Sequence, residues 1–253
     1  MQVIETHRRY SVPRVDLPTW ALDRHRWRGD ETVLDIGTGT GQYLAPLRER
    51  LPRGRILAGD LAPGMLRDLR FKGVPAEAML LNADAESLPL ADASCDAVIA
   101  SYVMFFIPDI PRAVAEMHRV LRPGGVLLAV TMAHAYQDEM RAVVNRALAH
   151  LGGPNATHWG TIQHRFSLES GQAHLDPHFR VTEHRIESAF VFPEAWPVLA
   201  YVNSSRDMIR DDVPPHRTWD EFIAALRDEV QAEIAAQGEF RVSKNAGVLI
   251  AIK

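Results

Sequence analysis

The sequence predicts an α/β protein built on a doubly wound, mostly parallel sheet. Two observations lead to this fold class. Short apolar runs recur along the first half of the chain, and segments with helical periodicity separate them. A repeated strand–helix order implies right-handed crossovers and helices on both faces of one sheet. The length of 253 residues, 47% of them hydrophobic, is sufficient for one large core or for a core with a small lid.

Continuous apolar runs predict strands that are buried on both faces, as in a parallel sheet covered by helices. The runs are TVLDI (32–36), RILAGD (55–60), AMLLNAD (78–84), DAVIAS (96–101) and GVLLAV (125–130). A helix should follow the glycines after the first run. It must begin near Tyr43, so that Pro46 falls in the first turn, where no N–H partner is needed.

Two further helices are predicted from apolar positions that recur at helical spacing. The first covers 110–121 and ends at the Arg-Pro-Gly-Gly of 122–125. The second covers 140–151 and ends at the Gly-Gly-Pro of 152–154. Together, these elements predict the crossover helices of the sheet.

The second half of the chain is less regular. Residues 152–178 are interpreted as loop with short helical pieces, and 179–192 as one strand. Thr218 and Glu221 form a capping box that opens a helix, which Gly238 ends. AGVLIAIK at 246–253 is predicted to be a final strand. We interpret 1–253 as a single domain, with a cofactor-binding core at about 28–132 and lid or substrate-pocket segments at about 152–178 and 193–238.

Composition favours some classes of protein over others. The net charge is −4 without a basic block, so a nucleic-acid partner is not expected. The single cysteine, Cys95, cannot form an internal disulfide, which favours a reducing, cytoplasmic setting. The first residues lack the apolar core of a signal peptide, and the longest near-apolar run, 97–107, is too short to span a membrane.

The stretch VLDIGTGTG (33–41) carries the main functional signal. A strand that ends at glycines and opens into a helix brings backbone N–H groups toward a ligand. The phosphate-binding P-loop is excluded because its lysine is missing, and the spacing differs from the GxGxxG of dinucleotide folds. The acid-first spacing fits a loop that binds S-adenosylmethionine. A tight turn without ligand is the alternative.

Two acids at strand ends support the ligand-binding interpretation. Asp60 lies about 20 residues beyond the glycines, where a carboxylate can accept hydrogen bonds from ribose hydroxyls. It could instead cap the helix that begins near Pro63. Asp84 ends the third run, where it can accept from an adenine amine while the N–H of Ala85 reaches a ring nitrogen.

Four stretches resemble the successive motifs of the class I S-adenosylmethionine-dependent methyltransferases, in the small-molecule branch that includes ubiquinone- and menaquinone-biosynthesis enzymes. They are VLDIGTGTG, ILAGDLAPGML, LNADAESLPLADASCDAVIAS and EMHRVLRPGGVLLAV, all within residues 28–132. The resemblance implies a Rossmann-like sheet of seven strands with the last strand antiparallel. It also implies S-adenosylmethionine as cofactor and S-adenosylhomocysteine as product. The insertion before the last strand, at about 193–238, is predicted to form a helical lid.

The resemblance also implies roles for individual residues. The methionine end of the cofactor would be held by Asp35, Gly37, Thr38, Gly39 and Gly41, and Tyr10 could fold over it. The ribose would contact Asp60 and Leu61, the adenine Asp84 and Ala85, and Ser101 would face the transferred methyl.

Tyr102 and His134 are the candidate catalytic residues. Tyr102 directly follows the fourth predicted strand, in a turn where quinone-branch relatives often carry histidine and this chain does not. His134 follows the fifth strand, where an imidazole could take a proton from the acceptor; a solvated loop histidine is the alternative. His158 and His164 could line a lid or lie on a surface loop. No metal site is predicted, because Pro177 interrupts the spacing of the downstream histidines.

The sequence therefore predicts methyl transfer from S-adenosylmethionine to a small organic molecule, such as a secondary metabolite or a quinone-like compound. A non-methylating enzyme on the same fold, for example a cyclase, is one alternative, and an RNA methyltransferase is a weaker one. A non-catalytic binding protein is disfavoured by the intact loop and Asp60. No membrane partner is expected, and a homodimer is left open.

Overall fold

The computed structural model describes residues 3–73, 78–157 and 159–253. The chain divides into two compact units, each assembled from separate segments. Unit 1 comprises Met1–Val15, Ala135–Ile162 and Glu187–Asn245, and unit 2 comprises Asp16–His134, Gln163–Ile186 and Ala246–Lys253. Among the described residues, no helix combines the length and apolar character needed to cross a bilayer.

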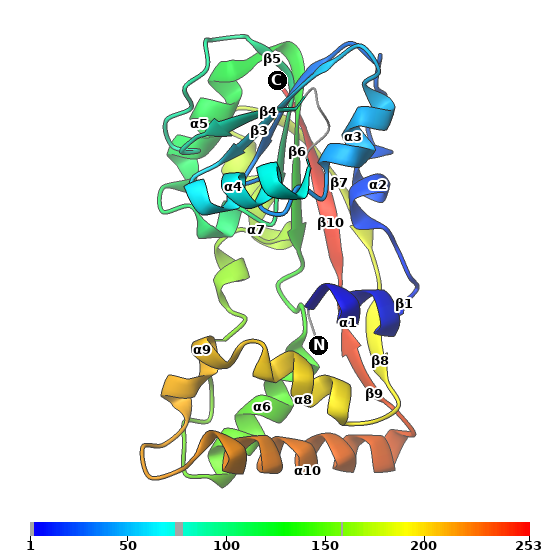
Figure 1. The fold of residues 1–253 in the computed structure, drawn as a ribbon, viewed down its shortest axis with the longest axis vertical. Helices are drawn as coiled ribbons and strands as arrows, with labels where there is room; N and C mark the ends of the chain where they lie inside the picture. Colours follow the sequence, from blue (N-terminus) through cyan, green and yellow to red (C-terminus); the bar gives the residue numbers. More distant parts are fainter. Residues whose placement is uncertain (1–2, 74–77, 158) are drawn as a thin grey trace. The chain divides into compact units, whose positions relative to one another are not determined.

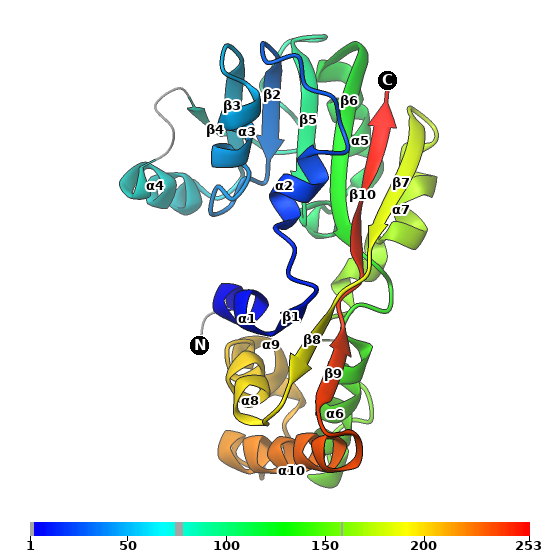
Figure 2. The same ribbon diagram turned by 90° about the vertical axis from the view of Figure 1, so that its right-hand side faces the viewer.

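Unit 2 contains a seven-stranded sheet with the order β4-β3-β2-β5-β6-β10-β7 (Figure 2). Its strands are β2 (Thr32–Ile36), β3 (Arg55–Asp60), β4 (Ala78–Asn82), β5 (Cys95–Ser101), β6 (Leu121–Met132), β7 (Arg180–Ile186) and β10 (Ala246–Ile252). The pairs between β4 and β6 are parallel, whereas β10 runs antiparallel to both β6 and β7. The predicted fold class, including the antiparallel last strand, is confirmed.

Helices cover both faces of this sheet. Successive strand residues point to opposite sides, and here they place apolar side chains on both faces that must be buried. The helices are α2 (Leu17–Leu22), α3 (Leu44–Arg50), α4 (Pro63–Lys72), α5 (Ile110–Val120) and α7 (Leu168–Leu175), with short 3₁₀ turns η1 (Met104–Phe106) and η2 (Ile162–Arg165). Leu34 and Val98 pack in one cluster with α5 and α7. Val33 and Ile99 pack in the other with α2 and α3.

Unit 1 combines a small antiparallel sheet with helices (Figure 1). Its sheet has the order β1-β8-β9, formed by β1 (Ser11–Val12), β8 (Ala189–Phe192) and β9 (Phe240–Ser243). Its helical elements are α1 (Val3–Tyr10), α6 (Asp138–His150), α8 (Trp196–Asn203), α9 (Arg206–Ile209), η3 (Arg210–Asp212) and α10 (Trp219–Gln237). Phe190, Phe192 and Phe222 lie fully buried in its core.

Several local predictions are confirmed. The helix α3 has Tyr43 at its N-cap, which leaves Pro46 in the first turn. The capping box at Thr218 opens α10, where the Thr218 side chain accepts from the Glu221 N–H, and Gly238 ends the helix in a left-handed conformation. Local sequence chemistry therefore fixed these helix ends.

The prediction of one strand over 179–192 is wrong. That segment forms β7 and β8, which belong to different sheets. The ladder to β10 stops at Ile186, and Ser188 instead bonds Lys244 through both its carbonyl and its hydroxyl (2.7 and 3.1 Å). The imperfect alternation of this segment reflects two strands with different buried faces.

Candidate active site

The glycine loop follows β2 and adopts left-handed backbone at three positions. The φ angles of Gly37, Gly39 and Gly41 are 72°, 52° and 77°. Four N–H groups of the loop are engaged within the protein. Gly37 and Thr38 donate to the carbonyl of Gly59 (2.8 and 3.0 Å), Gly39 donates to Asp60 Oδ2 (2.9 Å), and Gly41 donates to the carbonyl of Thr38 (2.8 Å). These bonds hold the loop against the end of β3.

The three glycines serve different purposes. A Cβ on Gly37 would lie 2.5 Å from Val103 Cγ2, and one on Gly41 would lie 2.7 Å from Leu69 Cδ2. A Cβ on Gly39 would meet nothing nearer than 3.9 Å. Gly37 and Gly41 therefore make room for the protein's own side chains. Only Gly39 of the three faces open space.

A cavity of about 270 Å³ lies beside the loop in unit 2. It is lined by Leu17, Pro18, Asp35, Gly37, Thr38, Gly39, Thr40, Gln42, Tyr43, Met65, Ser101 and Tyr102. The structure thus brings together most of the residues that the sequence assigns to the methionine end, together with Ser101 and Tyr102. The carboxyl ends of parallel strands meet at one edge of the sheet, where ligands bind in such folds.

Asp35 is the charged residue of this cavity, and it is 2% exposed. Burial raises its pKa to about 6, because the ionised form loses solvation, and the charge of Asp60 adds to the increase. The Thr38 hydroxyl donates to Asp35 Oδ2 at 2.7 Å, which opposes the increase. Asp35 is therefore ionised near pH 7 and protonated in mild acid.

Two tyrosines flank Ser101 in the cavity lining. Tyr102 has a φ of 52°, an uncommon conformation for a residue with a side chain, and its N–H donates to the carbonyl of Val130 (2.9 Å). Tyr43 is 5% exposed, and its hydroxyl is buried without a hydrogen-bond partner. Burial raises the pKa of Tyr43, an effect that the nearby Ser101 side chain reduces, so the phenol keeps its proton.

The acids at the strand ends lie outside the lining of this cavity. The Asp60 carboxylate accepts from the N–H groups of Gly39 and Ala62, each at 2.9 Å, and thus also contacts the start of α4. Leu61 is 67% exposed. The exposed Asp84 accepts from the Glu86 N–H (2.9 Å), and Ala85 beside it is buried.

His134 is exposed past the end of β6 and does not line the cavity. Its N–H donates to Glu169 Oε2 (2.7 Å), and its ring stacks on that of His164, with centroids 3.5 Å apart. The structure therefore places Tyr102, but not His134, beside the glycine loop. His158 lies outside the described residues.

Tyr10 belongs to α1 in unit 1. Its ring packs against Phe192 with centroids 5.1 Å apart, and the guanidinium of Arg9 lies 5.7 Å from its ring centre. Within unit 1, Tyr10 thus contributes to an apolar cluster.

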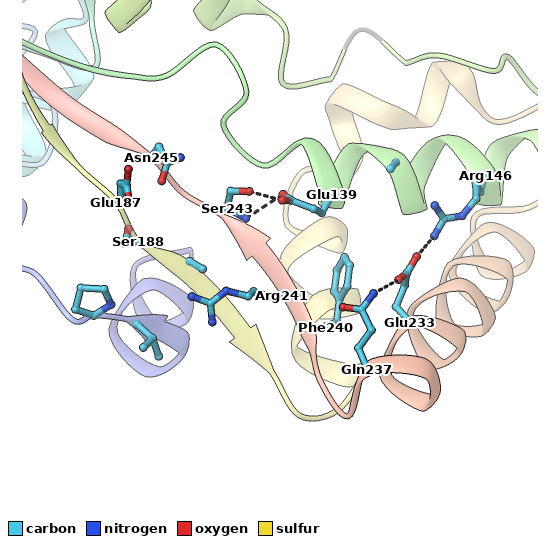
Figure 3. A pocket seen from close by; sticks show the side chains of 14 residues that line it. Glu139, Arg146, Glu187, Ser188, Glu233, Gln237, Phe240, Arg241, Ser243 and Asn245 are labelled. Carbon is cyan, nitrogen blue, oxygen red and sulfur yellow. Dashed lines mark hydrogen bonds and ion pairs between the residues drawn. The ribbon is translucent and has the colours of Figure 1, made fainter.

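A larger cavity of about 620 Å³ lies in unit 1 and was not anticipated from the sequence (Figure 3). Two of its charged lining residues, Arg146 and Glu233, form an ion pair. Arg146 contacts Glu229 and Glu233 (2.5 and 2.6 Å), and Glu139 accepts from the Ser243 N–H (2.9 Å).

Sequence reasoning missed the N-terminal wall of the glycine-loop cavity and Tyr43. Leu17 and Pro18 belong to α2, whose start is marked by Asp16, which accepts from the Thr19 N–H (3.2 Å). An acid followed by proline near the first helical position is an N-terminal signal that could have revealed α2. Tyr43 could have been noticed as the first bulky residue after the glycines.

Comparisons with known proteins agree with this geometry. Residues 34–129 match the family model described as "Methyltransferase domain". The demethylmenaquinone methyltransferase of Thermus thermophilus is 32% identical over 163 residues, which cover 62% of this chain and 73% of that enzyme. The malonyl-(acyl-carrier protein) O-methyltransferase of Methylococcus capsulatus is 40% identical over 119 residues, or 47% of this chain. The match spans 43% of the length of that enzyme.

Solved structures are similar in fold. A crystal structure titled as a putative methyltransferase from Bacillus halodurans superposes with a TM-score of 0.60 at 18% identity, covering 93% of this chain and 98% of that one. At this identity the likeness concerns the fold alone.

Proposed function

Because this chain belongs to the class I S-adenosylmethionine-dependent methyltransferases, we propose that it transfers the methyl group of that cofactor to a small organic molecule. The observation that carries the proposal is the cavity beside the glycine loop, where Asp35, Gly39 and Ser101 converge. The two relatives act, by their names, on demethylmenaquinone and on malonyl-acyl-carrier protein. A quinone-like compound or another small metabolite is the proposed acceptor.

The residues present fit the proposed cofactor. Asp35 offers a carboxylate to the ammonium of the methionine end, and the space at Gly39 admits a ligand close to the backbone. A carboxylate has about four acceptor sites, so Asp60 can accept from ribose hydroxyls in addition to its two N–H donors. Leu61 would contact the ribose, and Asp84 and Ala85 would receive the adenine.

The cofactor supplies an activated methyl group, so the protein mainly has to align the acceptor and exclude water. Ser101 and Tyr102 line the cavity, and Tyr102 would position the acceptor there. His134 is proposed to take up a proton when the acceptor atom must lose one. Residues 152–178 and 193–238 are proposed to bind the acceptor, with 1–253 acting as one catalytic domain.

Titration calorimetry with S-adenosylhomocysteine tests the proposal. The wild-type chain should bind, and Asp60→Ala should weaken binding by about tenfold or more, because the ribose hydroxyls lose a charged acceptor and Gly39 loses its partner. Asp68→Ala is the matched control, since Asp68 is an exposed acid on α4, and it should bind like wild type.

Absence of binding to the wild-type chain would reject the proposed function. An Asp60→Ala affinity within a few-fold of wild type would reject the placement of the ribose. An assay with labelled methyl then separates methyl transfer from a cyclase that only holds the cofactor.

A further inference from the structure

The glycine-loop cavity must bind a carboxylate without a basic side chain. The methionine end of the proposed cofactor carries an ammonium and a carboxylate group. Asp35 can pair with the ammonium, but among the described residues no lysine, arginine or histidine lines the cavity. The carboxylate therefore depends on neutral donors whose N–H or O–H groups are not already hydrogen-bonded within the protein.

Several neutral donors around the loop are already engaged. The N–H groups of Gly37, Thr38 and Gly39 donate to the end of β3, and that of Gly41 donates within the loop. The Thr38 hydroxyl donates to Asp35. A ligand carboxylate could use these groups only by displacing bonds that shape the loop.

Tyr43 offers a donor that is both buried and without a hydrogen-bond partner among the described residues. Its side chain lines the cavity, it is 5% exposed, and its hydroxyl has no partner although it is shielded from water. Leaving a buried hydroxyl unpaired costs free energy, so such groups are rare unless a ligand or water completes them. The raised pKa of Tyr43 keeps the phenol protonated, which makes it a donor.

We infer that the Tyr43 hydroxyl donates a hydrogen bond to the carboxylate of the methionine end of the cofactor. This assignment rests on the proposed function, because it takes S-adenosylmethionine as the ligand of the cavity. It gives Tyr43 a binding role that the motif spacing does not specify.

The test compares two ligands and two variants by titration calorimetry. S-adenosylhomocysteine carries the carboxylate, whereas 5′-methylthioadenosine lacks the whole amino-acid end. Tyr43→Phe should weaken binding of S-adenosylhomocysteine by about tenfold or more, as expected for a hydrogen bond to a charged group, and leave binding of 5′-methylthioadenosine unchanged. Tyr136→Phe is the control, because it also removes a phenol hydroxyl but Tyr136 does not line the glycine-loop cavity; it should leave both affinities unchanged.

Thermal unfolding without ligand checks the premise. Tyr43→Phe should unfold at the same temperature as wild type or higher, since the lost hydroxyl has no partner. Tyr201→Phe should unfold lower, because the Tyr201 hydroxyl is paired with Gln137 in unit 1 (3.1 Å). A lower melting temperature for Tyr43→Phe would show that its hydroxyl is paired and overturn the inference. Equal weakening of both ligands, or of neither, would overturn it as well. Failure of wild type to bind either ligand would instead reject the proposed function.

Discussion

At the scale of single residues, Asp35 combines a buried position with a charge that the proposed cofactor requires. Its pKa of about 6 lies well above the ordinary value of 3.8. Between these two pH values the folded protein retains a proton that the unfolded chain has lost, so Asp35 makes folding less favourable as pH rises from about 3.8 to 6. The residue is thus better adapted to binding a cation than to stabilising the fold.

The binding of S-adenosylhomocysteine should depend on this titration. The ligand's ammonium group favours the ionised carboxylate, so affinity should be constant above about pH 7 and fall as pH drops through 6, approaching a tenfold loss per pH unit below the pKa. Calorimetry between pH 5 and 8 would measure this dependence.

Asp35→Asn provides the comparison for the pH series. Its amide cannot titrate, so binding should be weaker than wild type at pH 7.5 and nearly independent of pH. A wild-type affinity that is flat down to pH 5 would contradict the role of Asp35.

At the scale of elements, two glycines of the loop are needed for different reasons: Gly37 for packing against Val103, and Gly39 for the space that a ligand would occupy. Gly37→Ala introduces a Cβ against Val103 in left-handed backbone, and Gly39→Ala introduces one into open space with the same backbone cost. The left-handed conformation costs about 1–2 kcal/mol for a residue with a side chain, and overpacking adds roughly 1–3 kcal/mol.

Urea unfolding should therefore show a loss of about 2–5 kcal/mol for Gly37→Ala and about 1–2 kcal/mol for Gly39→Ala. Gly39→Ala should nevertheless lose S-adenosylhomocysteine binding, because its methyl group would occupy ligand space. Equal destabilisation by the two substitutions would show that the Val103 side chain moves aside at little cost in stability. Normal binding by Gly39→Ala would show that the ligand does not occupy the space beside Gly39.

Elements defined by strong local patterns could be predicted from the sequence, and those defined by tertiary pairing could not. The strands at 32–36 and 55–60 were correct to the residue, and so was the capping box at Thr218. By contrast, β1 has two residues and β9 four, too few to show periodicity, and both depend on pairing with β8. The division of 179–192 depends likewise on where partner strands end.

The candidate site shows the same limit. Asp35 and Gly39 were singled out from motif spacing and Ser101 from the family resemblance, and all three line the cavity. Tyr43 could not be given a role, since its lack of a partner is a property of the packed structure. His134 follows β6 as predicted, yet which groups its ring would meet depends on the folded chain, and there it stacks on His164.

At the scale of the whole molecule, each unit has a core of its own. The apolar clusters of unit 2 cover the two faces of the large sheet, and that of unit 1 gathers around β8, β9 and α10. The glycine loop and the strand-end acids all belong to unit 2. The proposed cofactor should therefore stabilise unit 2 directly.

Hydrogen–deuterium exchange with and without S-adenosylhomocysteine tests this expectation. Ligand should increase protection of residues 35–43 and 59–62, and exchange in α10 should stay unchanged until an acceptor is added. Protection of α10 alone, with no change around the glycine loop, would contradict the assignment of the cofactor to unit 2. The Asp60→Ala variant, exposed to the same ligand concentration, controls for non-specific effects.

The place of β10 in the sheet has a consequence for how the protein matures on the ribosome. This strand, residues 246–252, lies between β6 and β7, and β7 pairs with no other described strand. During translation, about sixty residues are synthesised between β7 and β10, so residues 180–186 have no described strand to pair with until β10 is made. The seven-stranded sheet can be completed only when β10 inserts between β6 and β7, both of which are synthesised before it.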